Sequence, residues 1–393
     1  MVSVEEVARS FSLYNQETMR DPHSAYDQLR SKCPVAHSDM DDGFYIVTKY
    51  DDVAAVTRDT DTFSSREVVI PKTQFGPEFK DRPPVTADPP LHARYRRLLL
   101  PAFTQVRAQK WEPTIRKIVQ ETLEPLRGTT HCDVARVYAK RIPLRFMCAL
   151  MGVPSEMEDK FTQWAHDCIE SIDQDAMLHS VGELGQFLGE QVARRVEQPT
   201  DDLISTLMAT EVDGWRLEGQ DLVALLMVVL LAGLDTTWTV LSSTFLHLAT
   251  HPEDRRRLVS EPELIPTAVE EALRFYSPVA LSRETTRDAR VGGVTIPAES
   301  MVLLSWPAAN RDPDAFPDAD KFVVDRAENR HIAFGSGIHR CVGAPIARLE
   351  LRIALEEWLQ VIPEFELEDP DSVTFATGHV WGPRTVRLVY PPA

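Results

Sequence analysis

Cys341 is the residue whose surroundings offer the most chemistry. It lies near the end of residues 329–343, which read NRHIAFGSGIHRCVG. Gly335 and Gly337 would let the backbone approach a buried sulfur closely, and backbone N–H groups there would stabilise a thiolate. A helix that starts just after the cysteine, with Pro345 in its first turn, would add the positive end of its dipole. Because the thiolate is the form that binds metals, this pattern predicts a metal-ligating cysteine.

The other four cysteines carry no comparable pattern. Cys33, Cys132, Cys148 and Cys168 are widely spaced, and no Cys-x-x-Cys pair occurs among the five cysteines of the chain. The sequence therefore predicts neither a disulfide framework nor a structural zinc site. We expect these four side chains to be buried, unreactive and apolar in behaviour.

A second pattern interrupts a long apolar helix predicted over residues 221–250. Its first half is apolar on every side, which places it inside the protein. Ala232, Gly233, Asp235 and Thr236 break this pattern, although a mid-helix glycine costs about 1 kcal/mol and a buried carboxylate costs more unless it is paired. Two interpretations stay open. Thr236 could bond the carbonyl four residues earlier while Asp235 pairs with an arginine, or the two could deliver protons.

Charged residues on two further helices have the spacing of neighbours on one face. Glu271 and Arg274 are three residues apart, and His92 and Arg96 are four residues apart on a helix that we expect Asp88 to cap. The alternative for each pair is an exposed position that adds little stability.

The segment from Phe334 to Gly343 resembles the haem-binding signature of the cytochrome P-450 family. The resemblance extends from about residue 20 to the C-terminus. It implies that Cys341 is the axial ligand of a haem b iron, framed by Phe334, Gly335 and Gly343. It also implies that Asp235 and Thr236 act as an acid–alcohol pair for O2 reduction. Ala232 and Gly233 would lie beside the O2, where the glycine would let the helix bulge.

The same resemblance assigns roles to the charged residues. It implies that four side chains bind the two haem propionates: His92, Arg96, Arg283 and His339. It implies that three others form a buried ion-pair network that holds the cysteine loop: Glu271, Arg274 and Arg326.

Family analogy gives four apolar candidates for the substrate pocket: Phe75, Phe79, Val279 and Val380. Each of them fits an ordinary core position equally well. Terpenoid, steroid, fatty acid, macrolide and aromatic ether substrates all stay open.

Most of the chain has helical periodicity. The predicted helices span residues 21–32, 105–127, 154–170, 221–250, 262–275 and 344–361. Strands are predicted at 43–48, 301–305 and 384–390, and a hairpin at 282–296. We expect a mainly α protein with small β-sheets, the cytochrome P-450 fold with a long central helix over the haem. We also expect a single haem domain over residues 1–393 without a fused reductase.

The net charge of −18 argues against nonspecific binding to nucleic acids or anionic membranes. No basic-then-apolar leader segment occurs in residues 1–20, so we expect a cytoplasmic bacterial protein. We expect it to be a monomer. The resemblance implies a monooxygenase that hydroxylates, epoxidises or O-dealkylates a small, mostly apolar substrate. Ferredoxin and a ferredoxin reductase would supply electrons from NAD(P)H, docking at a basic patch made of Arg107, Lys110, Arg116, Lys117 and Arg340.

Two rival functions remain. A peroxide-consuming haem-thiolate enzyme usually lacks the acid–alcohol pair, which is present here at Asp235 and Thr236. A haem sensor or helical binding module has no evident need for that pair on a buried helix.

Overall fold

The computed structural model describes residues 3–72, 83–169 and 174–392. The chain forms two compact units, each built from separate stretches of sequence. The first unit contains Met1–His92, Glu263–Cys341 and Phe375–Pro383, and the second contains Ala93–Pro262, Val342–Thr374 and Arg384–Ala393. The expectation of one domain over the whole chain stays a prediction.

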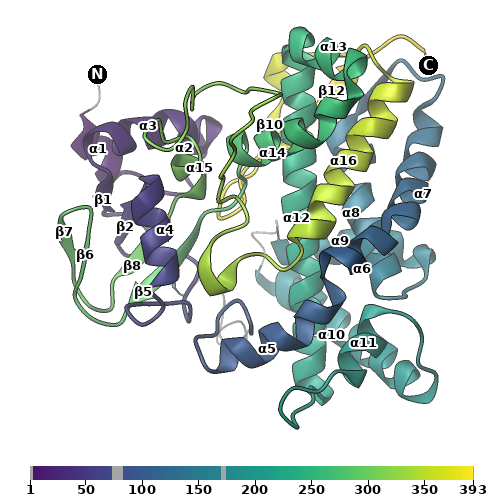
Figure 1. The fold of residues 1–393 in the computed structure, drawn as a ribbon, viewed down its shortest axis with the longest axis horizontal. Helices are drawn as coiled ribbons and strands as arrows, with labels where there is room; N and C mark the ends of the chain where they lie inside the picture. The colour runs from purple at the N-terminus through teal and green to yellow at the C-terminus, as the bar shows by residue number, and fades with distance from the viewer. Residues whose placement is uncertain (1–2, 73–82, 170–173, 393) are drawn as a thin grey trace. The chain divides into compact units, whose positions relative to one another are not determined.

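The first unit is built on a five-stranded sheet (Figure 1). Its strands, in spatial order, are β1 (Val35–Ser38), β2 (Phe44–Val47), β8 (Met301–Leu304), β5 (Leu281–Thr285) and β3 (Phe63–Ser64). β2 and β8 pair in parallel, and the other neighbours are antiparallel. The sequence predicted β2 and β8 within one or two residues.

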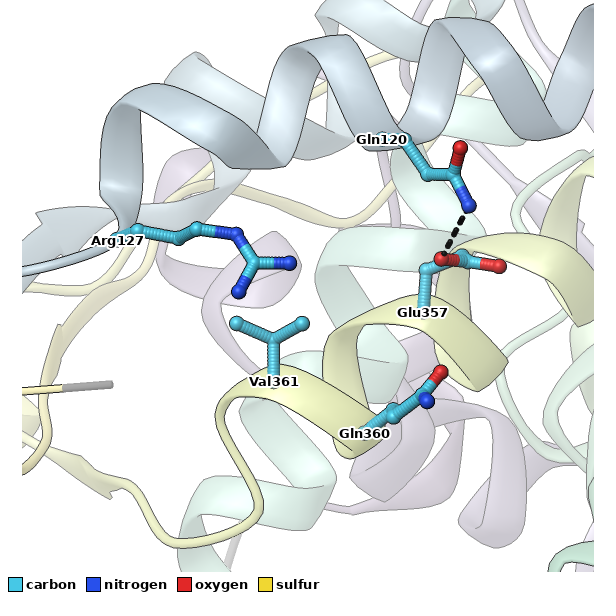
Figure 2. Close-up of a pocket in the computed structure, with 5 residues that line it drawn as sticks. All are labelled: Gln120, Arg127, Glu357, Gln360 and Val361. Carbon is cyan, nitrogen blue, oxygen red and sulfur yellow. Dashed lines mark hydrogen bonds between the residues drawn. The ribbon is translucent and has the colours of Figure 1, made fainter.

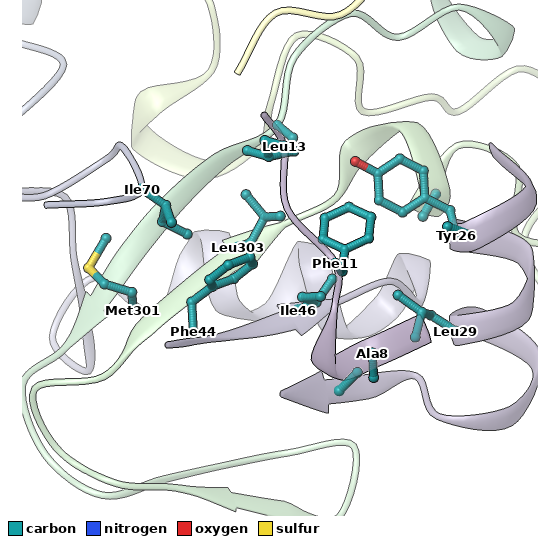
Figure 3. Packing of buried hydrophobic residues seen from close by; sticks show 14 of the residues in the cluster. Ala8, Phe11, Leu13, Tyr26, Leu29, Phe44, Ile46, Ile70, Met301 and Leu303 are labelled. Atoms are coloured by element: carbon teal, nitrogen blue, oxygen red, sulfur yellow. The ribbon is translucent and has the colours of Figure 1, made fainter. Parts of the chain in front are cut away.

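β8 is central because all four of its side chains are apolar and buried. Alternate residues of a strand point to opposite faces. Met301 and Leu303 accordingly join one hydrophobic cluster, which Figure 3 shows around Phe11, Phe44 and Ile70. Val302 and Leu304 join a second cluster. The sheet therefore has a core on both faces, which fixes the backbone of β5 beside it.

The hairpin predicted over residues 282–296 is shorter than expected. Only β6 (Ala289–Val291) and β7 (Val294–Ile296) pair as a hairpin, whereas β5 pairs with β8. Gly292 and Gly293 both have positive φ, as a two-residue type I′ turn requires. With its turn at these two glycines, the hairpin contains β6 and β7 alone. β5, which precedes them, pairs with β8 in the larger sheet.

The first unit also contains helices (Figure 1). They are α1 (Val4–Arg9), α2 (Gln16–Arg20), α3 (Pro22–Lys32), α4 (Tyr50–Arg58), α14 (Ile265–Phe275) and α15 (Trp306–Ala309). A 3-10 turn, η7 (Gly337–His339), lies just before Cys341.

The second unit is mainly helical, and α12 (Gly219–Thr250) runs through it beside α16 (Ala344–Val361) (Figure 1). The other helices are α6 (Gln105–Lys110), α7 (Glu112–Leu123), α8 (Arg141–Leu150), α9 (Glu158–Ile169), α10 (Gln174–Glu197), α11 (Leu203–Ala209) and α13 (Pro252–Ser260). β12 (Arg387–Val389) lies between β4 (His131–Asp133) and β9 (Glu366–Leu367). β10 (Thr374–Phe375) pairs with β11 (Pro383–Thr385).

α12 was predicted closely, and it has 32 residues, or about 48 Å at 1.5 Å per residue. Within the described residues, it is the one helix long and apolar enough to cross a membrane, a property that core helices of soluble proteins share. Every side chain from Trp238 to Phe245 is buried inside the protein. This burial is the pattern of a core helix.

The helix expected over residues 105–127 is divided at Trp111 into α6 and α7, where Pro113 begins a new first turn. α5 (Leu91–Leu99) begins after Pro90. The Asp88 carbonyl accepts from the His92 N–H at 3.0 Å at the start of this helix, and the Asp88 carboxylate accepts from the Ser65 N–H at 2.9 Å.

Candidate functional site

Residues 332–341 form the cysteine loop, which is closed by backbone hydrogen bonds. The N–H of Cys341 donates to the Phe334 carbonyl at 2.8 Å, and the N–H of Gly335 donates to the Ile332 carbonyl at 2.9 Å. The Cys341 side chain is exposed rather than buried as expected, so a ligand can reach its sulfur. α16 begins three residues later with Pro345 in its first turn, as the sequence predicted. Gly343 is the residue just before α16.

Glycine is needed at Gly337 for two reasons. Its φ is +66°, a conformation that side chains with a Cβ rarely adopt, and an added Cβ would lie 2.9 Å from the Thr57 carbonyl oxygen of α4. Gly335 also has a positive φ, but an added Cβ would be 3.9 Å from its nearest atoms. The loop therefore approaches α4 most closely at Gly337.

Glu271 binds both arginines that the resemblance grouped with it. Arg274 Nη2 and Nε donate to its carboxylate at 2.7 and 2.8 Å, and Arg326 Nε donates at 2.9 Å. The carboxylate also accepts from the Val323 N–H and from Asn329 Nδ2. Glu271 and Arg274 have no exposed surface in the protein, so the surface-pair alternative does not apply.

The network continues into the cysteine loop. Arg274 Nη1 donates to the Asn310 carbonyl at 2.8 Å, and the buried Asn310 side chain accepts from the Ile332 N–H at 2.8 Å. Ile332 in turn accepts the hydrogen bond from Gly335. Asn310 thus connects the ion pairs to the loop, although its sequence context gave no signal for this role.

Cationic and imidazole side chains gather near this loop in the first unit. The rings of His92 and His339 have centroids 4.3 Å apart, and His339 Nε2 lies 3.0 Å from Ser65 Oγ. Ser65 was not identified from the sequence. His92 and Arg96 lie four residues apart on α5, as the spacing predicted.

Arg283 on β5 is a deeply buried cation. Its side chain is 4% exposed, and within the described residues its guanidinium donates one hydrogen bond, to the Ser282 carbonyl at 2.7 Å. Burial lowers the pKa of Arg283 to about 10, against an opposing attraction from Asp88. A guanidinium at this depth is stabilised by an anion brought close to it. The residue therefore fits the carboxylates that a haem carries.

Asp235 and Thr236 lie on α12 in the second unit, and both make the ordinary contacts that the sequence left open. Thr236 Oγ1 donates to the Ala232 carbonyl at 3.1 Å. Asp235 is 4% exposed, and its Oδ1 accepts from Arg384 Nη2 at 2.7 Å. Arg384 comes from β11, 149 residues later, so no local pattern could have revealed it.

Arg384 makes two further contacts on α12 besides its ion pair with Asp235. Its guanidinium also donates to Thr239 Oγ1 at 2.8 Å and lies 4.3 Å from the centroid of the Trp238 ring. Lys140 lies 4.5 Å from the centroid of the same ring. Two cations therefore flank the helix turn that carries Asp235.

α12 is assigned as helix throughout Gly219–Thr250, and the bulge expected at Gly233 stays a prediction. An added Cβ at Gly233 would lie 2.8 Å from Met147 Sδ on α8. The methionine side chain would have to shift to make room for it.

Two of the other cysteines have the unreactive character expected of them. Burial raises the pKa of Cys132 to about 11 and that of Cys148 to about 12, so both thiols stay protonated near neutral pH.

The four pocket candidates have different outcomes. Phe75 and Phe79 lie outside the described residues. Val279 and Val380, 101 positions apart in the sequence, pair through an isolated antiparallel bridge, and both are half-buried. The structure thus brings two of the candidates together on the first unit.

A cavity of about 380 Å³ lies between α7 and α16 in the second unit (Figure 2). It is lined by Gln120, Arg127, Glu357, Gln360 and Val361. Gln120 Nε2 donates to Glu357 at 3.0 Å across it. None of the predicted site residues lines this cavity.

Known proteins resemble this chain over nearly its whole length. The sequence model of the family described as Cytochrome P450 matches residues 10–178 and 155–377. Mycinamicin IV hydroxylase/epoxidase of Micromonospora griseorubida is 38% identical over 334 residues, 84% of each protein. Vitamin D(3) 25-hydroxylase of Pseudonocardia autotrophica is 37% identical over 361 residues, 90% of each. The solved structure of cytochrome P450 CYP109Q5 from Chondromyces apiculatus has a TM-score of 0.91 at 31% identity, covering 98% of this chain and 99% of that one.

Replacing Glu271 by Gln is expected to destabilise the first unit by about 3–5 kcal/mol, because two buried guanidinium groups lose their anion. Urea denaturation followed by circular dichroism measures this loss. Asp318→Asn is the matched control, because Asp318 also pairs at i,i+3, with Lys321, but at the surface. An equal shift in the urea midpoint of both variants would contradict the proposed importance of burial.

Gly337→Ala is expected to lower the haem content of purified protein more than Gly335→Ala. Both substitutions place a side chain at positive φ, but only the first meets the Thr57 carbonyl at 2.9 Å. The measurement is the ratio of pyridine haemochrome to protein. Equal haem content in the two variants would show that the approach to α4 does not matter.

Proposed function

The chain belongs to the cytochrome P450 family, and from that premise we propose that it inserts one oxygen atom of O2 into a largely apolar substrate with electrons from a ferredoxin. The chain is a monooxygenase, and its family uses haem and O2. The observation that supports the detailed proposal most strongly is the hydrogen-bonded loop that ends at Cys341.

Cys341 is the proposed axial ligand of the haem iron. Its loop is held at the Phe334 carbonyl, and its side chain is accessible. The haem, when bound, supplies the electron transfer and O–O bond cleavage that amino-acid side chains cannot perform, and a thiolate ligand favours that cleavage.

Arg283 is the proposed partner of a haem propionate, together with His92, Arg96 and His339. Support comes from its burial and from the single carbonyl bond that its guanidinium makes within the described residues. Two imidazoles and two guanidiniums would supply the donors that buried carboxylates require.

Asp235 and Thr236 are the proposed proton carriers. For this role, the Thr236 hydroxyl must turn from the Ala232 carbonyl, and Asp235 must exchange its bond to Arg384 for a bond to water. The Thr236 contact is a neutral hydrogen bond, whose net contribution to stability is about 1 kcal/mol. The Asp235–Arg384 contact is a buried ion pair, so its opening costs more and requires water to solvate both charges.

The proposed electron donors are a ferredoxin and an NAD(P)H-dependent reductase. Part of the basic patch suggested for docking is neutralised, because Arg116 pairs with Glu112, Glu356 and Glu357, and Lys117 lies 3.7 Å from Glu121. Arg107 and Lys110 on α6 are exposed and remain the proposed docking cations of the second unit.

The proposed substrate is organic and largely apolar, and the proposed reaction is hydroxylation, epoxidation or O-dealkylation. Support comes from the apolar pair Val279 and Val380, and from relatives named for a hydroxylase/epoxidase and a 25-hydroxylase. We propose a cytoplasmic location, in keeping with α12 as a core helix.

Replacing Cys341 by Ala is expected to abolish the red-shifted absorption that a sulfur-ligated haem shows when reduced under carbon monoxide. Cys132→Ala is the control, because its thiol stays protonated at neutral pH. Product from a screened ligand should form only when ferredoxin and reductase are both added to NAD(P)H. Product formed with peroxide alone, at an equal rate, would instead support the peroxide-consuming alternative.

Asp235→Asn is expected to slow product formation by about 10²-fold, the lower end of the range for acid–base groups, and to enlarge the solvent deuterium isotope effect. Asn still accepts a hydrogen bond from Arg384, so the change removes mainly the exchangeable proton. Asp221→Asn tests specificity, because Asp221 lies in the exposed first turn of the same helix. Unchanged turnover in the Asp235 variant would remove this residue from the proton path.

A further inference from the structure

His379 lies in the first unit where the backbone of residues 280–282 changes its pairing partner. We call this point the fork, because Ser282 pairs with Val68 whereas Ala280 pairs with His379. On one side of the fork, the Ser282 N–H donates to the Val68 carbonyl at 2.9 Å. In an antiparallel ladder with this register, the next hydrogen-bonded pair would join Ile70 to Ala280, two residues along each segment. The backbone of His379 is found there instead, because its carbonyl accepts from the Ala280 N–H at 2.9 Å.

The imidazole of His379 spans the gap that this exchange leaves. Its Nδ1 donates to the Ala280 carbonyl at 2.7 Å, and its Nε2 accepts from the Ile70 N–H at 2.9 Å. The two backbone groups that would bind each other in a continuous ladder are thus bridged by one ring. The ring holds Ile70 farther from Ala280 than the roughly 4.8 Å between directly paired strands.

The hydrogen bonds of the ring favour its neutral form. A carbonyl can only accept, so Nδ1 carries the proton. Nε2 lies 2.9 Å from the Ile70 N and 3.3 Å from the Ile70 carbonyl, and the shorter contact requires Nε2 to be unprotonated. Burial lowers the pKa of His379, against the opposing effects of its backbone partners and of Asp41. The edge of the Tyr14 ring packs 6.3 Å away, centroid to centroid. The bridge is therefore intact at neutral pH.

The fork also sets the position of two apolar side chains. Val380 directly follows His379 and pairs with Val279, which directly precedes Ala280. The Trp381 N–H closes this bridge by donating to the Pro278 carbonyl at 2.8 Å. Any change in the gap at His379 therefore moves the two half-buried valines relative to Ile70, whose side chain is fixed in the core of the unit (Figure 3).

We propose that His379 is a positioning residue for substrate selection, a spacer whose ring sets the separation between Ile70 and the Val279–Val380 pair. The proposal rests on the proposed function, in which these valines contact substrate. The ring itself does not touch the reacting atoms. It acts through the valines, so its loss should affect ligands long enough to reach them and spare ligands that contact only the iron.

Three substitutions separate the two hydrogen bonds of the ring. His379→Gln places an amide oxygen near the position of Nε2, so it keeps the bond from Ile70. His379→Asn places an amide nitrogen near Nδ1, so it keeps only the bond to Ala280. His379→Ala loses both bonds. His37→Ala is the matched control, because His37 is an exposed histidine on β1 of the same unit.

The probes are imidazole and its 1-butyl, 1-octyl and 1-dodecyl derivatives, titrated into the haem-bound protein and followed by the Soret shift. Imidazole should bind all variants with the same dissociation constant. His379→Ala should weaken 1-dodecylimidazole by about tenfold or more, the order expected when contact with one buried valine side chain is lost. His379→Gln should restore most of this affinity, and His379→Asn should not.

Three results would overturn the proposal. The first is that His379→Ala has the same dissociation constants as the unmodified protein. The second is that His379→Ala binds imidazole and all its derivatives more weakly by the same factor. The third is that His379→Asn restores the affinity for 1-dodecylimidazole as completely as His379→Gln. The carbon monoxide spectrum is recorded first for each variant. A missing sulfur-ligated absorption in the unmodified protein would contradict the proposed function, whereas a normal spectrum with any of the three results contradicts only the role of His379.

Discussion

The carboxylate of Glu271 receives five hydrogen bonds from the described residues, and hydrogen bonds through Arg274 and Asn310 connect it to the cysteine loop. Two come from Arg274, and the others come from Arg326, Asn329 and the Val323 N–H. A buried ion pair of this kind adds little net stability compared with apolar packing, but losing one partner is severe. Its value here is positional, because Arg274 continues through Asn310 to the backbone that leads to the loop.

Two buried arginines outside this network differ in their surroundings. Arg384 in the second unit is bound to the carboxylate of Asp235 at 2.7 Å, so its charge is balanced within the protein. Arg283 in the first unit donates to one carbonyl within the described residues, and burial lowers its pKa to about 10. The first arrangement needs no ligand for its stability, whereas the second gains from an anion supplied by one.

The sequence predicted those parts of the protein in which local chemistry and regular periodicity agree. The bounds of α16 were correct, and α12 was correct within two residues, because long apolar periodicity leaves few alternatives. The predicted hairpin was too long, since β5 pairs instead with β8, a strand that comes later in the sequence. The contact of Gly233 with Met147 on α8 could not be predicted, because it joins two helices far apart in the sequence.

The candidate site shows the same division. The types and spacing of residues singled out Cys341 and the pair Glu271 and Arg274. The family resemblance added Arg326, which the structure places against Glu271. No local pattern indicated the contacts that Arg384, Asn310 and His379 make, because each acts on a partner far away in the sequence, and a single side chain has no periodicity. The pairing of Val279 with Val380 likewise follows from the fold alone.

The distance along the chain between Asp235 and Arg384 also has a consequence for biosynthesis. The carboxylate on α12 is made 149 residues before its guanidinium partner, an interval of about 7 to 30 s at bacterial to eukaryotic rates of translation. β12, the middle strand of its sheet, is likewise made after both of its neighbours. In the nascent second unit, the acid of the central helix therefore has no guanidinium partner until Arg384 has been made and has left the ribosome.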